Sequence, residues 1–206
     1  MINPIFFIAK WWEIKKMDRA ANDFIYLVEE NLKDSRGLHV ETAIAATCSV
    51  AGTLIMRSAN IDFSRDPSLQ PGQYVIVVAL EEKGTQALGF LSAACGSFGL
   101  EPNTGWTLPI PDENKPHFSD IDLVRRFERP LNLVCYNKNI DENSRFKVAL
   151  LAAAKLIKSA LTIGLNPEIG KAIAGMSLIS STKMVPPLPE PNPALQRTPP
   201  PGAADL

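Results

Sequence analysis

The side chains best suited to chemistry in this 206-residue chain lie around its two histidines and in one group of arginines. His39 and Glu41 stand at the start of a long apolar segment. A carboxylate beside an imidazole can tune a general base, so the two residues form a candidate catalytic acid–base pair. The alternative is ordinary polarity in the first turn of a helix, and we favour this second interpretation.

The arginines Arg125, Arg126 and Arg129 follow Asp120 and Asp122 in a charged stretch. Three guanidinium groups on one surface could hold an anion, which makes them candidate anion-binding residues. However, Asp122 and Arg126 are separated by one helical turn, the spacing of an ordinary surface ion pair. The spacing therefore favours surface pairing over a binding site.

Other chemical motifs are missing from the sequence. It contains no glycine-rich phosphate loop, no HExxH, no CxxC and no GxSxG. With two histidines, a zinc site would need ligands from distant segments, so we predict no metal and no cofactor. Cys48, Cys95 and Cys135 are odd in number and widely spaced, which favours buried, reduced thiols in a cytoplasmic protein.

The overall composition is that of an ordinary globular protein, with 46% apolar and 21% charged residues. The net charge of −1 removes the electrostatic case for nucleic-acid binding. The N-terminal apolar run is too short for a secretory signal and has its charges on the wrong side. We therefore expect a cytoplasmic protein with no nucleic-acid partner and no membrane partner.

Two segments with almost no charge must form the interior of the protein, 42–56 and 148–163. A helix that is apolar on most sides is buried. Neither segment should cross a membrane, because the first is shorter than the ~20 residues required and the second carries Lys155 and Lys158. They predict an all-α domain, a compact bundle of about five to seven helices around a buried central helix.

The remaining helices are predicted from apolar periodicity and capping residues at 17–36, 85–98, 119–137 and 166–182. Segment 74–80 has strand propensity but only one weak partner, 107–110, so we interpret it as extended or as a short helix. An α+β fold with one short hairpin is the alternative. Trp106 lies in the proline-rich connection 101–117 and should be at least half buried.

The predicted organisation has three parts. Residues 1–16 are an N-terminal extension, either a genuine helix with packed aromatic residues or a start-site artefact preceding Met17. Residues 17–185 form a single helical domain. Residues 186–206 hold eight prolines and few large apolar residues, which predicts a disordered tail. The stretch 186–193 also fits a polyproline-binding groove, although we favour no partner for it.

The last fifteen residues, NPALQRTPPPGAADL at 192–206, resemble the translated ends of bacterial integron gene cassettes. This resemblance implies a bacterial mobile gene that is read through into its flanking site, and it implies no activity. The body of the chain resembles bacterial proteins of unknown function, so the resemblance transfers no site residues.

These observations predict a non-enzymatic interaction protein or small-ligand-binding protein that acts as a homodimer. Leu151 is the candidate interface residue, because it lies in the narrow polar stripe of the helix at 148–163. An enzyme with His39 and Glu41 as its acid–base pair is the alternative. The sequence does not identify the ligand.

Overall fold

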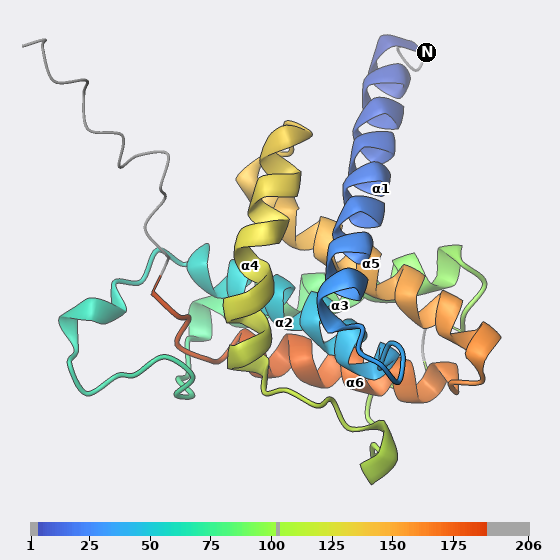
Figure 1. Ribbon diagram of the computed structural model, residues 1–206. Coiled ribbons are helices and arrows are strands. Elements are labelled where there is room, and N and C mark those ends of the chain that lie inside the picture. The colour runs from blue at the N-terminus through green and yellow to red at the C-terminus, as the bar shows by residue number, and fades with distance from the viewer. Residues whose placement is uncertain (1–3, 102–103, 189–206) are drawn as a thin grey trace, which may run out of the picture.

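The computed structural model describes residues 4–101 and 104–188, except for the side chains of residues 4–10. Within these residues the fold consists of six α-helices and contains no strand (Figure 1). The helices are α1 (Pro4–Leu32), α2 (Val40–Arg57), α3 (Glu81–Ser97), α4 (Asp120–Asn137), α5 (Arg145–Ala160) and α6 (Pro167–Ser181). The prediction of an all-α bundle is confirmed, and the alternative hairpin is not needed.

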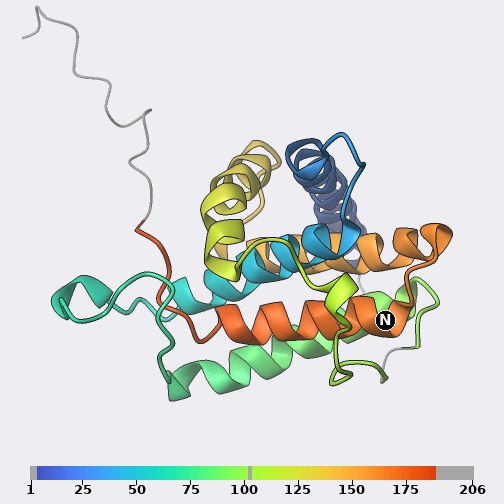
Figure 2. The same cartoon turned by 60° about the horizontal axis from the view of Figure 1, so that its bottom comes forward.

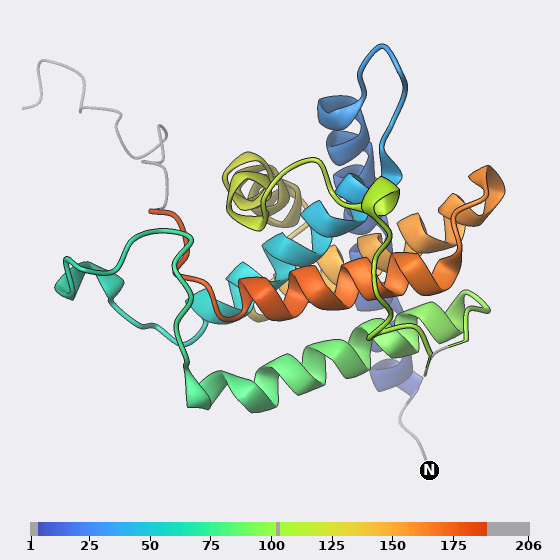
Figure 3. The same ribbon diagram turned by 90° about the horizontal axis from the view of Figure 1, so that it is seen from below.

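Helix α2 is the central helix of the bundle. Its residues from Val40 to Met56 are all buried except Leu54, and it packs against α6, α5, α4 and α1. The approach to α6 is close: a Cβ at Gly52 would lie 2.6 Å from the carbonyl oxygen of Leu178. In Figure 3, α2, α6 and α3 run side by side, whereas α4 is seen nearly end-on. The small residues of α2 therefore allow neighbouring helices to meet around it.

Helix α5 is the second buried helix, and α1 packs on it. Lys155 of α5 donates a hydrogen bond to Asn22 of α1 at 2.6 Å and forms an ion pair with Asp18 at 2.6 Å. Leu151 lies one turn before Lys155 and is partly buried against the core. Residues four apart share one face of a helix, so this face of α5 is covered by α1 of the same chain.

Several boundaries differ from the predicted ones. Helix α1 begins at Pro4, so the expected boundary at residue 17 lies inside a continuous helix. Helix α3 starts at Glu81, four residues earlier than expected, with two glutamates in its first turn. Helix α5 lies three residues earlier than the predicted segment 148–163, and short 3-10 turns at 142–144 and 161–163 flank it.

Segment 74–80 combines both conformations that were expected for it. Tyr74 forms an isolated antiparallel bridge with Met184, and Val78–Leu80 is a 3-10 turn. The predicted partner at 107–110 is not used. Trp106 is more than half buried and packs against the core, as predicted.

The chain after α6 folds back onto the domain. The amide of Gly72 donates a hydrogen bond to the Val185 carbonyl at 2.9 Å, and Arg57 donates one to the Pro187 carbonyl at 2.7 Å. Pro186 and Pro187 are buried, and Leu188 is exposed. The predicted disordered tail starts at residue 186. Residues 189–206 of this tail lie outside the described residues.

Candidate functional site

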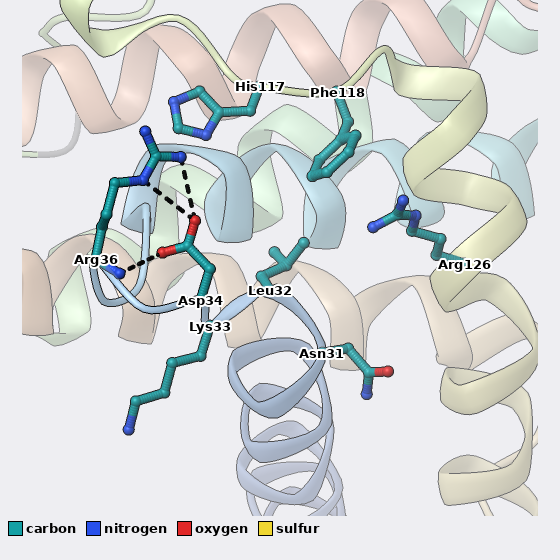
Figure 4. Close-up of a pocket in the computed structure, with 8 residues that line it drawn as sticks. All are labelled: Asn31, Leu32, Lys33, Asp34, Arg36, His117, Phe118 and Arg126. Carbon is teal, nitrogen blue, oxygen red and sulfur yellow. Dashed lines mark hydrogen bonds and ion pairs between the residues drawn. The ribbon is translucent and has the colours of Figure 1, made fainter.

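A surface pocket of about 630 Å³ lies where α1 ends, beside the chain that leads into α4 (Figure 4). Its walls come from the last turn of α1, the turn between α1 and α2, the residues before α4, and α4 itself. The residues lining it are Asn31, Leu32, Lys33, Asp34, Arg36, His117, Phe118 and Arg126. Three cationic residues and one acidic residue line it, which favours an anionic ligand.

Arg126 is the cation on the α4 side of the pocket. Its guanidinium lies over the Phe118 ring, 4.1 Å from the ring centroid, and no carboxylate pairs with it among the described residues. Of the other predicted anion-binding residues, Arg125 pairs with Asp122 at 3.4 Å and Arg129 does not line the pocket. The structure therefore places only Arg126 of this group at the site.

On the opposite side, the tight turn between α1 and α2 holds Arg36. Asp34 and Gly37 exchange both backbone hydrogen bonds at 3.1 Å, and Gly37 adopts a φ of 110°, which suits glycine. Arg36 binds the Asp34 carboxylate through its backbone amide and its guanidinium, at 2.7 Å and 3.1 Å. These bonds lower the pKa of Asp34. In Figure 4, Lys33 extends away from His117 and Phe118.

His117 connects the pocket with the predicted acid–base pair. Its ring stacks on the ring of His39, with centroids 3.6 Å apart and planes inclined by 24°. The backbone amide of His117 donates to Thr42 Oγ1 at 2.9 Å, and the same Oγ1 lies 2.8 Å from His39 Nδ1. Thr42, in the first turn of α2, thus links the two histidines.

His39 caps the N-terminus of α2. Its Nδ1 accepts a hydrogen bond from the Thr42 amide at 3.3 Å, so the proton of the neutral ring belongs on Nε2. Nε2 lies 3.6 Å from a carboxylate oxygen of Glu41. Burial lowers the pKa of His39, and it outweighs the opposing effect of Glu41. Burial and the cap therefore favour the neutral form of the ring in the folded protein.

Glu41 has a structural partner as well. Its side chain is 12% exposed and accepts a hydrogen bond from Asn114 Nδ2 at 2.7 Å. This bond ties the connection before α4 to the start of α2. The predicted acid–base pair is thus brought together. However, Nδ1 of His39 is used in capping α2, and the Glu41 carboxylate is used in holding the connection before α4.

Of the eight residues that line the pocket, the sequence analysis named only Arg126, and it missed His117, Phe118, Lys33 and Arg36 among the others. Ordinary side chains in loops carry no spacing signal, because the path of the connection decides what they contact. A usable hint was the aromatic Phe118 directly before the Ser119 cap of α4, near the three arginines. Leu151, the predicted interface residue, lies on α5 and does not line the pocket.

Metal binding finds no support in the described part of the chain, where no group of three or more His, Cys, Asp or Glu side chains could hold an ion. The three cysteines are free and buried. No helix in the described ranges is long and apolar enough to cross a membrane.

Comparison of the chain with protein-family models, curated protein sequences and solved structures gave no match.

Proposed function

We propose that this protein is a non-enzymatic binding protein that holds a small organic anion in the pocket between Arg36, His117 and Arg126. The single observation that carries this proposal is Arg126, a cation at a pocket wall without a carboxylate partner among the described residues. A guanidinium binds carboxylate or phosphate groups through two parallel hydrogen bonds. Leu32 and Phe118 add apolar surface for the body of such a ligand.

The size of the pocket agrees with this ligand class, since sites for small molecules measure about 300–1,000 Å³. Most other basic side chains of the described residues already have an acidic partner, such as Arg57 with Glu128 and Lys138 with Asp23. Binding an anion at Arg126 would complete the same kind of pairing. The proposal thus assigns one of the predicted arginines to a ligand.

A first test is mass spectrometry of small molecules released from the purified protein, compared between wild type and Arg126→Gln. We expect a carboxylate or phosphate compound to accompany the wild type and to be lost from the variant. Arg125→Gln is the matched control, because Arg125 is the adjacent residue, pairs with Asp122 and does not line the pocket. Equal recovery from all three proteins would contradict the proposal.

The enzymatic alternative assigns acid–base chemistry to His39 and Glu41. It has less support, because the Nδ1 lone pair of His39 accepts the Thr42 amide and Glu41 is bonded to Asn114. The side chain that reaches the pocket is instead His117, which is exposed. A general base must reach its substrate within hydrogen-bonding distance, so His39 would have to leave its cap.

The proposed assembly is a homodimer, and an exposed backbone edge at 74–77 supports it better than Leu151 does. Val75 and Gln73 bond to the chain at 183–185, so the backbone groups of Tyr74 and Ile76 point the other way. Ile76 is 89% exposed, and Tyr74 and Val78 are exposed too. An uncharged edge of this kind pairs readily with another strand.

Two copies of this edge can pair antiparallel across a two-fold axis near Ile76, because such an interface uses the same patch on both chains. Sedimentation equilibrium at micromolar concentration should give twice the chain mass of 22.5 kDa. Ile76→Lys should shift the protein to monomer, whereas Leu133→Lys, an exposed residue on α4, should not. A monomeric wild type would contradict the dimer and leave the anion site untouched.

A further inference from the structure

The first part of α1 projects from the domain in Figure 1, and in Figure 2 the same helix is strongly foreshortened. Packing of α1 on the core begins at Met17, which is partly buried, and continues with the fully buried Ala20 and Ala21. The ion pair between Lys155 and Asp18 marks the level at which α1 leaves α5. Residues 4–16 extend beyond it by about 20 Å, at 1.5 Å per residue.

This projecting segment is apolar without having one apolar face. Eight of the ten residues from Ile5 to Ile14 are apolar, and consecutive residues of a helix differ in direction by about 100°. Trp11 and Trp12 are 51% and 53% exposed and contact each other edge to face, with ring centroids 5.6 Å apart. Ile14 is 53% exposed as well. The domain therefore leaves Trp11, Trp12 and Ile14 at least half exposed.

A second copy of the chain is a poor cover for this segment. A partner helix covers one stripe in which residues recur every three or four positions, and the neighbouring Trp11 and Trp12 cannot share such a stripe. The segment also carries Lys10, Lys15 and Lys16 against the single acidic residue Glu13. Two such segments side by side would place like charges together.

A lipid surface fits the same features. The chemistry changes along the helix axis, from the sequence IFFIA at 5–9 through Trp11 and Trp12 to Lys15 and Lys16. Bilayers show the same order, with hydrocarbon inside, tryptophan at the interface and lysine beside anionic headgroups. Lys15 lies 5.3 Å from the centre of the Trp11 ring, which places the charge next to the aromatic residue.

We propose that residues 4–16 are a peripheral membrane anchor that inserts into the surface of an anionic bilayer, with the turns at 5–9 deepest. The insertion is interfacial, since no helix among the described residues could span the bilayer. It departs from the expectation of no membrane partner, which considered only a secretory signal at the N-terminus and membrane-spanning by the segments 42–56 and 148–163. The proposal does not depend on the anion site.

The test is flotation of the full chain with unilamellar vesicles of 70% phosphatidylcholine and 30% phosphatidylglycerol. We expect the wild type to float, with much weaker binding to pure phosphatidylcholine and at high salt. Trp11→Glu/Trp12→Glu should reduce the bound fraction at least tenfold. Met176→Glu is the matched control, because Met176 is 57% exposed and lies on α6, which is not one of the helices packed against α1.

Quenching by brominated lipids gives a second readout that needs no variant, because tryptophans at the interface lose fluorescence when such lipids surround them. Failure of the wild type to float on anionic vesicles would overturn the proposal. Equal flotation of the double tryptophan variant would also overturn it. A change of the double variant from dimer to monomer, without any flotation of the wild type, would show instead that a second copy covers the segment.

Discussion

His117 stacks on His39 with ring centroids 3.6 Å apart, and both histidines are joined to Thr42 of α2. One ring caps a helix and the other lines the pocket, so helix stability and pocket shape depend on the same contact. Protonation of His39 would remove the acceptor for the Thr42 amide and place a charge against His117. The stack therefore favours the neutral form of His39.

The first prediction concerns pH. The pKa of His39 is lowered from its ordinary 6.5, mainly by burial, with contributions from His117 and Arg36 against the opposing Glu41 and Glu113 backbone. The unfolded chain then binds a proton that the folded protein excludes. Its contribution to stability is complete above about pH 6.5 and is lost as the pH falls towards the lower folded pKa.

His39→Asn should weaken this dependence, because asparagine still caps the helix but does not titrate. The measurement is urea unfolding of both proteins at pH 7.5 and pH 5.5. The wild type should lose more free energy of unfolding between these two pH values than the variant. An identical loss in both proteins would show that His39 does not carry the effect.

The second prediction concerns the thiols. Burial raises the pKa of Cys95 and of Cys135 to about 11 and raises that of Cys48 further. Since the thiolate is the reactive form, all three should label slowly with a thiol reagent at pH 7.5 and rapidly in denaturant. Fast native labelling of Cys48 would contradict its burial and revive a nucleophilic role.

The third prediction concerns the C-terminal segment. Arg57 binds Glu128 and the carbonyl of Pro187, so ending the chain after Val185 removes an acceptor from a partly buried guanidinium. We expect a loss of about 1–3 kcal/mol in unfolding free energy. Ending the chain after Leu188 should leave the melting temperature unchanged. Equal stability of both truncated chains would show that residues 186–188 contribute nothing.

The fourth prediction concerns Lys171, whose side chain is fully buried in α6. Its ammonium pairs with Glu168 at 2.7 Å and donates hydrogen bonds to the Glu101 carbonyl and to Thr104. Glu168→Gln removes the opposite charge and should cost about 2–4 kcal/mol in unfolding free energy. Adding Lys171→Met should restore part of that loss, because the buried charge disappears. Thermal and urea unfolding of the two variants would measure both effects.

The sequence alone predicted the helices whose signals are local. Ser119 and Asn166 cap α4 and α6 as expected, and the uncharged segments became the buried α2 and α5. The length of α1 was left open, because the aromatic run before Met17 lacks one apolar face. The predicted start of helix α3 was four residues too late, because the polar first turn of this helix resembles a loop.

The candidate site was predictable only in part. The favoured interpretation of His39, polarity in the first turn of a helix, agrees with its position as the N-cap of α2. The expected pair of Asp122 with Arg126 is wrong: Asp122 pairs with Arg125, and Arg126 lies over Phe118. Contacts such as that of His39 with His117 join distant segments of the chain, so local residue spacing cannot predict them.

The fifth prediction tests anion binding at Arg126 directly. Inorganic phosphate and benzoate, the simplest phosphate and carboxylate probes, should bind the wild type in isothermal titration at low ionic strength. Arg126→Gln should weaken binding at least tenfold, which corresponds to about 1.4 kcal/mol. Arg125→Gln should bind like the wild type. Absence of binding to the wild type, or equal binding by Arg126→Gln, would contradict the proposed function.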